Sequence, residues 1–334
     1  MILDLSQETR VSLLLTSPLM EGTNNRSLEP LTPMEFLRLS NFVTTHGRNI
    51  IDFISPNADE FIQGTAEILD PERIKRLLAQ GFLLAQMIER WKSRSIWILS
   101  QFDHAYPKRF FTAFGQDAPI LIYGCGDPAL LDVGGLAVVG SRNADESLLK
   151  YAEEVGCLTA TSGKAVISGV SREIDQAAMR EVLSSEGISV GIMADSLERA
   201  VLNQQNRIPL KENRLVLISP YHPGSGFNTV NDLQRNKLIY ALADAALIIS
   251  SDYHKGGIWA GAVEQLEKLK LVTVYVRSIG ATQRALQALI SKGARPWPNP
   301  KSVEDFNEAL ALTTLDVHAP AKQAQLSFED PFKT

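Results

Sequence analysis

The 334-residue sequence contains few of the residues that build metal centres, disulfide frameworks and membrane spans. It holds two cysteines, Cys125 and Cys157, and five scattered histidines, so we expect two buried, reduced thiols and no metal site. No apolar run approaches the roughly 18 residues that a membrane helix needs, which predicts no membrane partner. The first ten residues lack a basic segment followed by an apolar stretch, so a cytoplasmic location is expected.

The chain also lacks an excess of positive charge. It has 33 Lys and Arg against 38 Asp and Glu, a formal net charge of -5. Proteins that bind nucleic acid without sequence preference are usually basic, because affinity comes from neutralising phosphates. Any nucleic-acid site must therefore be a local basic pocket on an acidic body.

Helical periodicity dominates residues 1–95, which we expect to form a small helical N-terminal domain. The clearest helix spans residues 32–43. Thr32 is its expected N-cap, Pro33 occupies the first helical position, and Glu35 is the acid that completes a capping box.

Short apolar runs alternate with helical stretches through most of residues 96–300. The expected strands are 136–140, 165–168, 188–193, 215–219, 246–250 and 271–276. Continuous apolar strands separated by helices indicate a parallel sheet covered on both faces, which predicts an α/β, doubly wound, Rossmann-like domain. Residues 301–334 would add a short helix at 303–312 and then a polar, disordered tail.

Ligands bind such a sheet outside the carboxyl ends of its strands, and small, polar and basic residues follow several of these ends. Backbone N–H groups of a glycine turn that opens a helix bind anions, and a basic side chain adds charge-assisted hydrogen bonds. The glycine spacing fits neither a G-x-G-x-x-G fingerprint nor a phosphate loop, so NAD, ATP and other cofactors are not expected. The candidate phosphate-binding residues are Gly140, Ser141, Arg142, Ser168, Gly169, Arg172, Arg235, Asn236, Lys237, Lys255 and Gly256.

Each motif also has a purely structural interpretation. Gly140 to Arg142 fit a strand-to-helix turn with a solvated arginine. Arg235 and Lys237 fit the solvated, charged start of a helix. Trp259 could stack on a base, but a tryptophan at that place more often packs in the core.

A series of short elements nevertheless stands in one order. They are Tyr106-Pro107, residues 118–123 (APILIY), residues 137–142 (AVVGSR), Ser168-Gly169 with Arg172, Ile174-Asp175 and Ala177-Ala178, Asn203, Ser219, residues 235–239 (RNKLI), Gly256 and residues 289–294 (LISKGA). In this order they resemble the DprA/Smf family of DNA-processing proteins across residues 104–297. The sequence departs from the family at Glu173, where an R-G-I-D motif has glycine, and this places a negative charge beside the expected phosphate site.

The resemblance implies a Rossmann-like domain that binds single-stranded DNA along its sugar-phosphate backbone in DNA processing, recombination or uptake. It further implies a binding protein without catalytic residues, a homodimer, and a strand-exchange recombinase that the protein helps to load. Two alternatives stay open on the same fold. One is a nucleotide-sensing or regulatory module, for example in anti-phage defence. The other is a nucleotide phosphoribohydrolase, in whose P-G-G-x-G-T-x-x-E motif Glu264 would fall one position late, about 100° around the helix.

Overall fold

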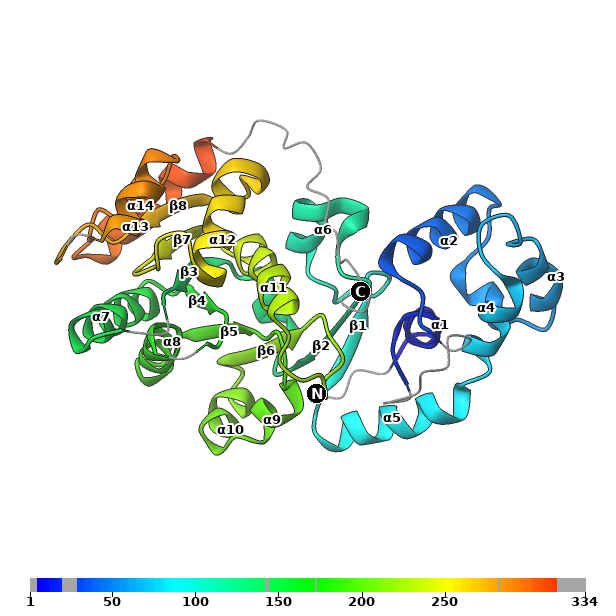
Figure 1. Ribbon diagram of the computed structural model, residues 1–334. Helices are drawn as coiled ribbons and strands as arrows, with labels where there is room; N and C mark the ends of the chain where they lie inside the picture. Colours follow the sequence, from blue (N-terminus) through cyan, green and yellow to red (C-terminus); the bar gives the residue numbers. More distant parts are fainter. Residues whose placement is uncertain (1–4, 20–28, 142–143, 172, 282, 317–334) are drawn as a thin grey trace.

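The computed structural model describes residues 5–19, 29–141, 144–171, 173–281 and 283–316, with side chains described up to residue 311 (Figure 1). The candidate residues Arg142 and Arg172 lie outside the described residues. The expected polar tail also lies outside them from residue 317 onward.

Helices form the N-terminal part of the chain: α1 (Gln7–Thr16), α2 (Pro33–Thr45), η2 (Ile50–Ile54), α3 (Ala58–Gln63), α4 (Pro71–Leu78) and α5 (Gly81–Ser93). The capping box predicted at the start of α2 is confirmed. The Thr32 hydroxyl accepts from the Glu35 N–H at 3.2 Å, and the Glu35 carboxylate accepts from the Thr32 N–H at 2.8 Å. Arg73 of α4 binds the same carboxylate at 2.7 Å, which ties α4 to the start of α2.

The first helix fastens this helical region to the sheet. Leu13 and Leu14 of α1 belong to the sheet's hydrophobic core, whereas Val11 and Leu15 belong to the helical core. The Ser17 hydroxyl lies 3.0 Å from that of Tyr123, and both groups are buried. Figure 1 accordingly shows α1 beside the β1–β2 end of the sheet.

The sheet contains β1 (Trp97–Ser100), β2 (Leu121–Cys125), β3 (Gly135–Val139), β4 (Ala165–Ser168), β5 (Ile188–Ile192), β6 (Leu215–Ser219), β7 (Ala245–Ile248), β8 (Thr273–Val276) and β9 (Arg295–Pro296). Their order across the sheet is β1-β2-β6-β5-β4-β3-β7-β8-β9. Strand β2 runs antiparallel to both of its neighbours, and the other described pairs are parallel. The predicted α/β fold with a doubly wound parallel sheet is confirmed, and the antiparallel pairing of β2 at one end of the sheet is an addition that was not predicted.

Helices cover both faces of the sheet (Figure 1). The remaining elements are α6 (Lys108–Phe114), η3 (Gly115–Asp117), η4 (Pro128–Asp132), α7 (Glu146–Thr161), α8 (Ile174–Ser184), α9 (Leu197–Leu202), α10 (Gln204–Lys211), α11 (Thr229–Leu242), α12 (Gly256–Glu264), η5 (Gln265–Leu269), α13 (Arg284–Ser291) and α14 (Val303–Asp316). Leu136 and Val138 of β3 share a core with α7 and α8, whereas Ala137 and Val139 share the opposite core with α6, α11 and α12. This alternation within one strand is what a doubly wound sheet requires.

One detail of the sequence-based expectation is wrong. Cys125 in β2 is buried as predicted, but Cys157 is exposed on α7. Its helix buries the face that carries Leu148, Ala152 and Val155, and Cys157 lies off that face. Within the described ranges, no helix combines the length and the apolar character needed to cross a bilayer.

Candidate nucleic-acid interface

The parallel strands β4, β3 and β7 are neighbours, so their carboxyl ends meet at one edge of the sheet. The backbone N–H of Ser141, after β3, donates to the Ser250 hydroxyl, after β7, at 3.0 Å. Helices α8 and α12 begin in the segments that follow β4 and β7. The structure therefore brings together the glycine turns that the sequence placed after separate strands.

Two of these glycines are required by close packing. A side chain at Gly140 would collide with the Ile174 side chain, and one at Gly169 would collide with the guanidinium of Arg235. The backbone can approach neighbouring groups here only because both positions lack a Cβ.

Arg235 lies beneath the edge, and its side chain is buried. Its guanidinium donates to the carbonyl oxygens of Gly169 and of Ile192, the latter at 2.7 Å, and pairs with Asp232. It therefore satisfies the carbonyls that follow β4 and end β5. In the structure Arg235 therefore holds two backbone carbonyls of this edge, and the direct phosphate contact expected from the sequence stays a prediction.

Asn236 and Lys237 also make internal contacts. The Asn236 amide donates to the Gly257 carbonyl oxygen at 3.2 Å and thereby ties α11 to the first turn of α12. The Lys237 ammonium is buried and lies 3.2 Å from the Glu264 carboxylate. Lys237 is therefore not part of a solvated helix start, and a phosphate contact by Asn236 or Lys237 stays a prediction.

Buried polar groups of β4 and α8 shape the same turn. The Ser168 hydroxyl donates to the Val138 carbonyl oxygen at 2.7 Å and is directed into the sheet. The Asp175 carboxylate accepts from the Ser171 hydroxyl at 2.7 Å and from the Gly140 N–H at 3.3 Å. Burial raises the pKa of the Asp175 carboxyl, against the lowering effect of the Ser171 hydrogen bond. Asp175 is a buried positioning residue of the edge that the sequence-based candidates missed.

Helices α8 and α12 both begin at this edge of the sheet, α8 with Ile174 and Asp175 buried and α12 with Gly256 exposed. Neither helix has a side-chain hydrogen bond at its N-cap. The first N–H groups of a helix have no intrahelical acceptor and carry the positive end of the helix dipole, so they bind anions well. Gly256 opens α12 at a φ of 78° with open space beside it, and Lys255 is exposed next to it.

Glu173 places a carboxylate at this edge. As the N-cap of α8 it has a φ of 68° and a ψ of -102°, a conformation that side-chain-bearing residues rarely adopt. Its carboxylate accepts from the Ala144 N–H at 2.5 Å and so occupies a backbone donor in the segment after β3. A signal of this strain was visible in the sequence, because the R-G-I-D motif has glycine where this chain has Glu173. Glycine adopts a positive φ readily, whereas glutamate does not.

The aromatic residues after β7 belong mostly to the core. Trp259 is 7% exposed, which confirms the more frequent of its two sequence interpretations. Its ring centroid lies 5.3 Å from that of Tyr253, and the Arg284 guanidinium lies 4.2 Å from the Tyr253 centroid.

Comparison with known proteins identifies the family. The sequence profile of DNA recombination-mediator protein A matches residues 97–310, which is more than half of the chain. The chain belongs to the DNA recombination-mediator protein A family. The match begins at β1, includes the whole sheet and ends within α14.

Individual relatives are distant. The chain is 26% identical over 158 residues to the DNA processing protein DprA of Streptococcus pneumoniae, covering 47% of this chain and 55% of the relative. It is 28% identical over 177 residues to a DprA-type protein of Mycobacterium tuberculosis, covering 48% and 46%. The chain thus spans about half the length of the curated relatives it matches.

Solved structures share the fold. The crystal structure of DprA from Streptococcus pneumoniae matches with a TM-score of 0.63 at 18% identity, covering 92% of this chain and 98% of that chain. A structure of DprA from Helicobacter pylori, solved to explain how that protein binds single-stranded DNA, matches with a TM-score of 0.53 at 20% identity and covers 65% and 97%.

Proposed function

We propose that the chain binds single-stranded DNA along its sugar-phosphate backbone at the carboxyl edge of the sheet, as a non-enzymatic DNA-processing protein. The observation that carries this proposal is that two helices without side-chain caps, α8 and α12, begin at the same edge of the sheet, with Lys255 exposed at the start of α12. Phosphates are the natural ligands of such donors, and phosphate contacts hold a strand without reading its sequence. The Helicobacter pylori relative, whose structure concerns single-stranded DNA binding, supports the choice of ligand.

The internal contacts of two carboxylates favour binding over hydrolysis. Glu264, the carboxylate considered for a phosphoribohydrolase, pairs with buried Lys237. It also lies eight residues after Gly256, which is about 12 Å along the helix axis. Asp175 is buried beneath the turn and holds backbone N–H groups. These two carboxylates are therefore committed to structure.

Membership of a recombination-mediator family supports two extensions of the proposal: a homodimer, and a strand-exchange recombinase as partner. Light scattering at two protein concentrations tests the first, and a monomer at both would contradict it. Pull-down of purified recombinase with and without single-stranded DNA tests the second. If the recombinase is retained only when single-stranded DNA is present, the DNA bridges the two proteins. That result would argue against a direct contact between them.

Fluorescence anisotropy with labelled oligo-dT and with a matched duplex, at two salt concentrations, tests the proposal. Lys255→Ala should weaken binding of the single strand and reduce the slope of log K against log salt by about 1, as expected for one lost phosphate contact. Arg142→Ala tests the remaining sequence-based prediction in the same way. Lys211→Ala is the matched control, because Lys211 is exposed and precedes β6 at the opposite edge of the sheet.

Each outcome separates the functions considered. Tight, salt-sensitive binding of the single strand that Lys255→Ala weakens and Lys211→Ala leaves unchanged supports the proposal. Equal effects of the two lysine variants would place the strand elsewhere. Displacement of the oligonucleotide by a mononucleotide at micromolar concentration would favour the nucleotide-sensing alternative.

A further inference from the structure

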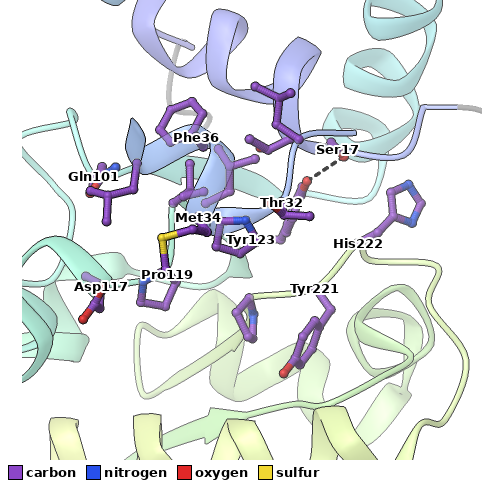
Figure 2. Close-up of a pocket in the computed structure, with 18 of the residues that line it drawn as sticks. Ser17, Thr32, Met34, Phe36, Gln101, Asp117, Pro119, Tyr123, Tyr221 and His222 are labelled. Carbon is purple, nitrogen blue, oxygen red and sulfur yellow. Dashed lines mark hydrogen bonds between the residues drawn. The ribbon is translucent and has the colours of Figure 1, made fainter. Parts of the chain in front are cut away.

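A cavity lies away from the glycine turns, between the N-terminal helices and the sheet (Figure 2). Its volume is about 820 Å³, within the range of sites that hold small organic groups. Segments far apart in the sequence line it, among them residues 31–37 at the start of α2, Gln101 after β1, residues 116–121 leading into β2, and residues 220–222 after β6.

The chemistry of the walls suits an uncharged, flat group. The described lining contains no lysine or arginine, and Asp117 contributes a carboxylate, so a phosphate would be disfavoured there. Met34, Pro119 and Tyr221 contribute apolar and aromatic surface, and Gln101 offers both a hydrogen-bond donor and an acceptor (Figure 2). A nucleobase combines a π face with polar edges and matches this lining.

Topology places the cavity on the same sheet edge as the proposed phosphate site. Ser219 ends β6 and is paired with Tyr123, so the start of antiparallel β2 lies beyond the carboxyl end of β6. Crossing from β4 through β5 and β6 to β2 takes three strand spacings, about 14 Å.

Helix α11 connects the two places. The Tyr221 hydroxyl donates to the carbonyl oxygen of Asn231 in α11 at 3.3 Å. One turn further along the same helix, Arg235 holds the carbonyl oxygens of Gly169 and Ile192. The aromatic wall of the cavity is therefore fixed to the helix that also positions the phosphate edge.

We propose that this cavity takes one unpaired base of the strand whose phosphates lie along the sheet edge. The proposal rests on the proposed function. The walls, which carry no lysine or arginine among the described lining, accept the base, with Tyr221 as its stacking surface and Gln101 and Asp117 facing its polar edge. The helix N-termini hold the backbone.

The test uses the full chain and a fluorescein-labelled oligo-dT of the shortest length that binds, so that the strand cannot slide. A single abasic site is moved through the oligonucleotide, and one position should lower affinity roughly fivefold to 100-fold, the effect of losing one stacked base. Tyr221→Ala should weaken the intact strand similarly and abolish the sensitivity to that abasic position. Tyr221→Phe keeps the ring and should stay within about twofold of wild type.

A second measurement identifies the cavity directly. Oligo-dT carrying 5-iododeoxyuridine at the sensitive position should crosslink to residues 31–37 or 220–222. Two results would overturn the proposal that the cavity holds a base and would leave the proposed function standing. One is strong binding whose affinity does not depend on the position of the abasic site, and the other is crosslinks confined to the turns at Gly140 and Gly169. Failure of wild type to bind any single strand would overturn both.

Discussion

Replacing Glu173 by glycine should strengthen the binding of single-stranded DNA. The Glu173 carboxylate accepts from the Ala144 N–H at 2.5 Å, at the edge where we place the phosphates. The substitution removes that negative charge and releases the backbone donor of Ala144. It also relieves backbone strain, because the position has a φ of 68°, which glycine adopts readily.

The size of the effect follows from charge and distance. A phosphate held about 7 Å from the carboxylate would be repelled by roughly 0.6 kcal/mol at a dielectric constant of 80 and by roughly 2.4 kcal/mol at 20. A gain of about 1–2 kcal/mol, or roughly fivefold to 30-fold in Kd, is therefore expected at low salt. Stability should change little, because about 1–3 kcal/mol of relieved backbone strain offsets a lost charged hydrogen bond of about 1.5–3 kcal/mol.

Anisotropy titrations of four proteins make the comparison: wild type, Glu173→Gly, Glu173→Gln and Glu186→Gly. The glutamine variant removes the charge but keeps the side chain, so it separates repulsion from backbone strain. Glu186→Gly is the matched control, since Glu186 is exposed, has a φ of 59°, and precedes β5 at the opposite edge of the sheet.

The reasoning predicts tighter binding for both Glu173 variants, unchanged binding for the control, and a gain that shrinks as salt rises. If Glu173→Gly and Glu173→Gln bind no more tightly than wild type at low salt, the phosphates do not pass near this carboxylate. Our placement of the strand would then be refuted.

Two further predictions concern stability. Arg235→Leu leaves two buried carbonyls without their donor and should lower the free energy of unfolding by about 3–5 kcal/mol in urea titrations, whereas exposed Arg180→Leu should cost below about 0.5 kcal/mol. Unchanged stability with lost DNA binding in Arg235→Leu would show that this side chain contacts the strand directly. Burial raises the pKa of the Glu35 carboxyl, but hydrogen bonds from Arg73 and Thr32 outweigh it, and the net shift is downward. The resulting stability is present above the ordinary pKa of the carboxyl and is lost as pH falls through the lowered value, so Glu35→Gln should flatten the acid limb of a pH-stability curve.

The fold was largely predictable because buried parallel strands read as continuous apolar runs. Helix α10 was missed for a physical reason: it buries no residue and carries Pro209 within it, so neither an apolar stripe nor composition marks it as helical. The antiparallel direction of β2 was also outside the reach of periodicity, which carries no information about strand direction.

The site was less predictable, because charged side chains in a sequence are normally expected to be exposed to solvent. Arg235 is buried since carbonyl oxygens of Gly169 and Ile192, distant in sequence, need a donor, and Lys237 is buried since Glu264 approaches from another helix. Such pairings exist only after the chain has folded. Glu173 was different, because the sequence already showed glutamate where the family motif has glycine. The sequence did not show that its carboxylate accepts from the Ala144 N–H.

Hydrogen–deuterium exchange of the backbone amides, with and without oligo-dT, tests the central claim most directly. Helix N-termini without side-chain caps exchange readily when no ligand is bound. We predict that the single strand protects the first turns of α8 and α12, above all at Gln176 and at residues 256–258, which are not buried, and that the matched duplex protects them less. Protection confined to other segments, with these amides exchanging as fast as in the unbound protein, would contradict the claim that DNA binds at this edge.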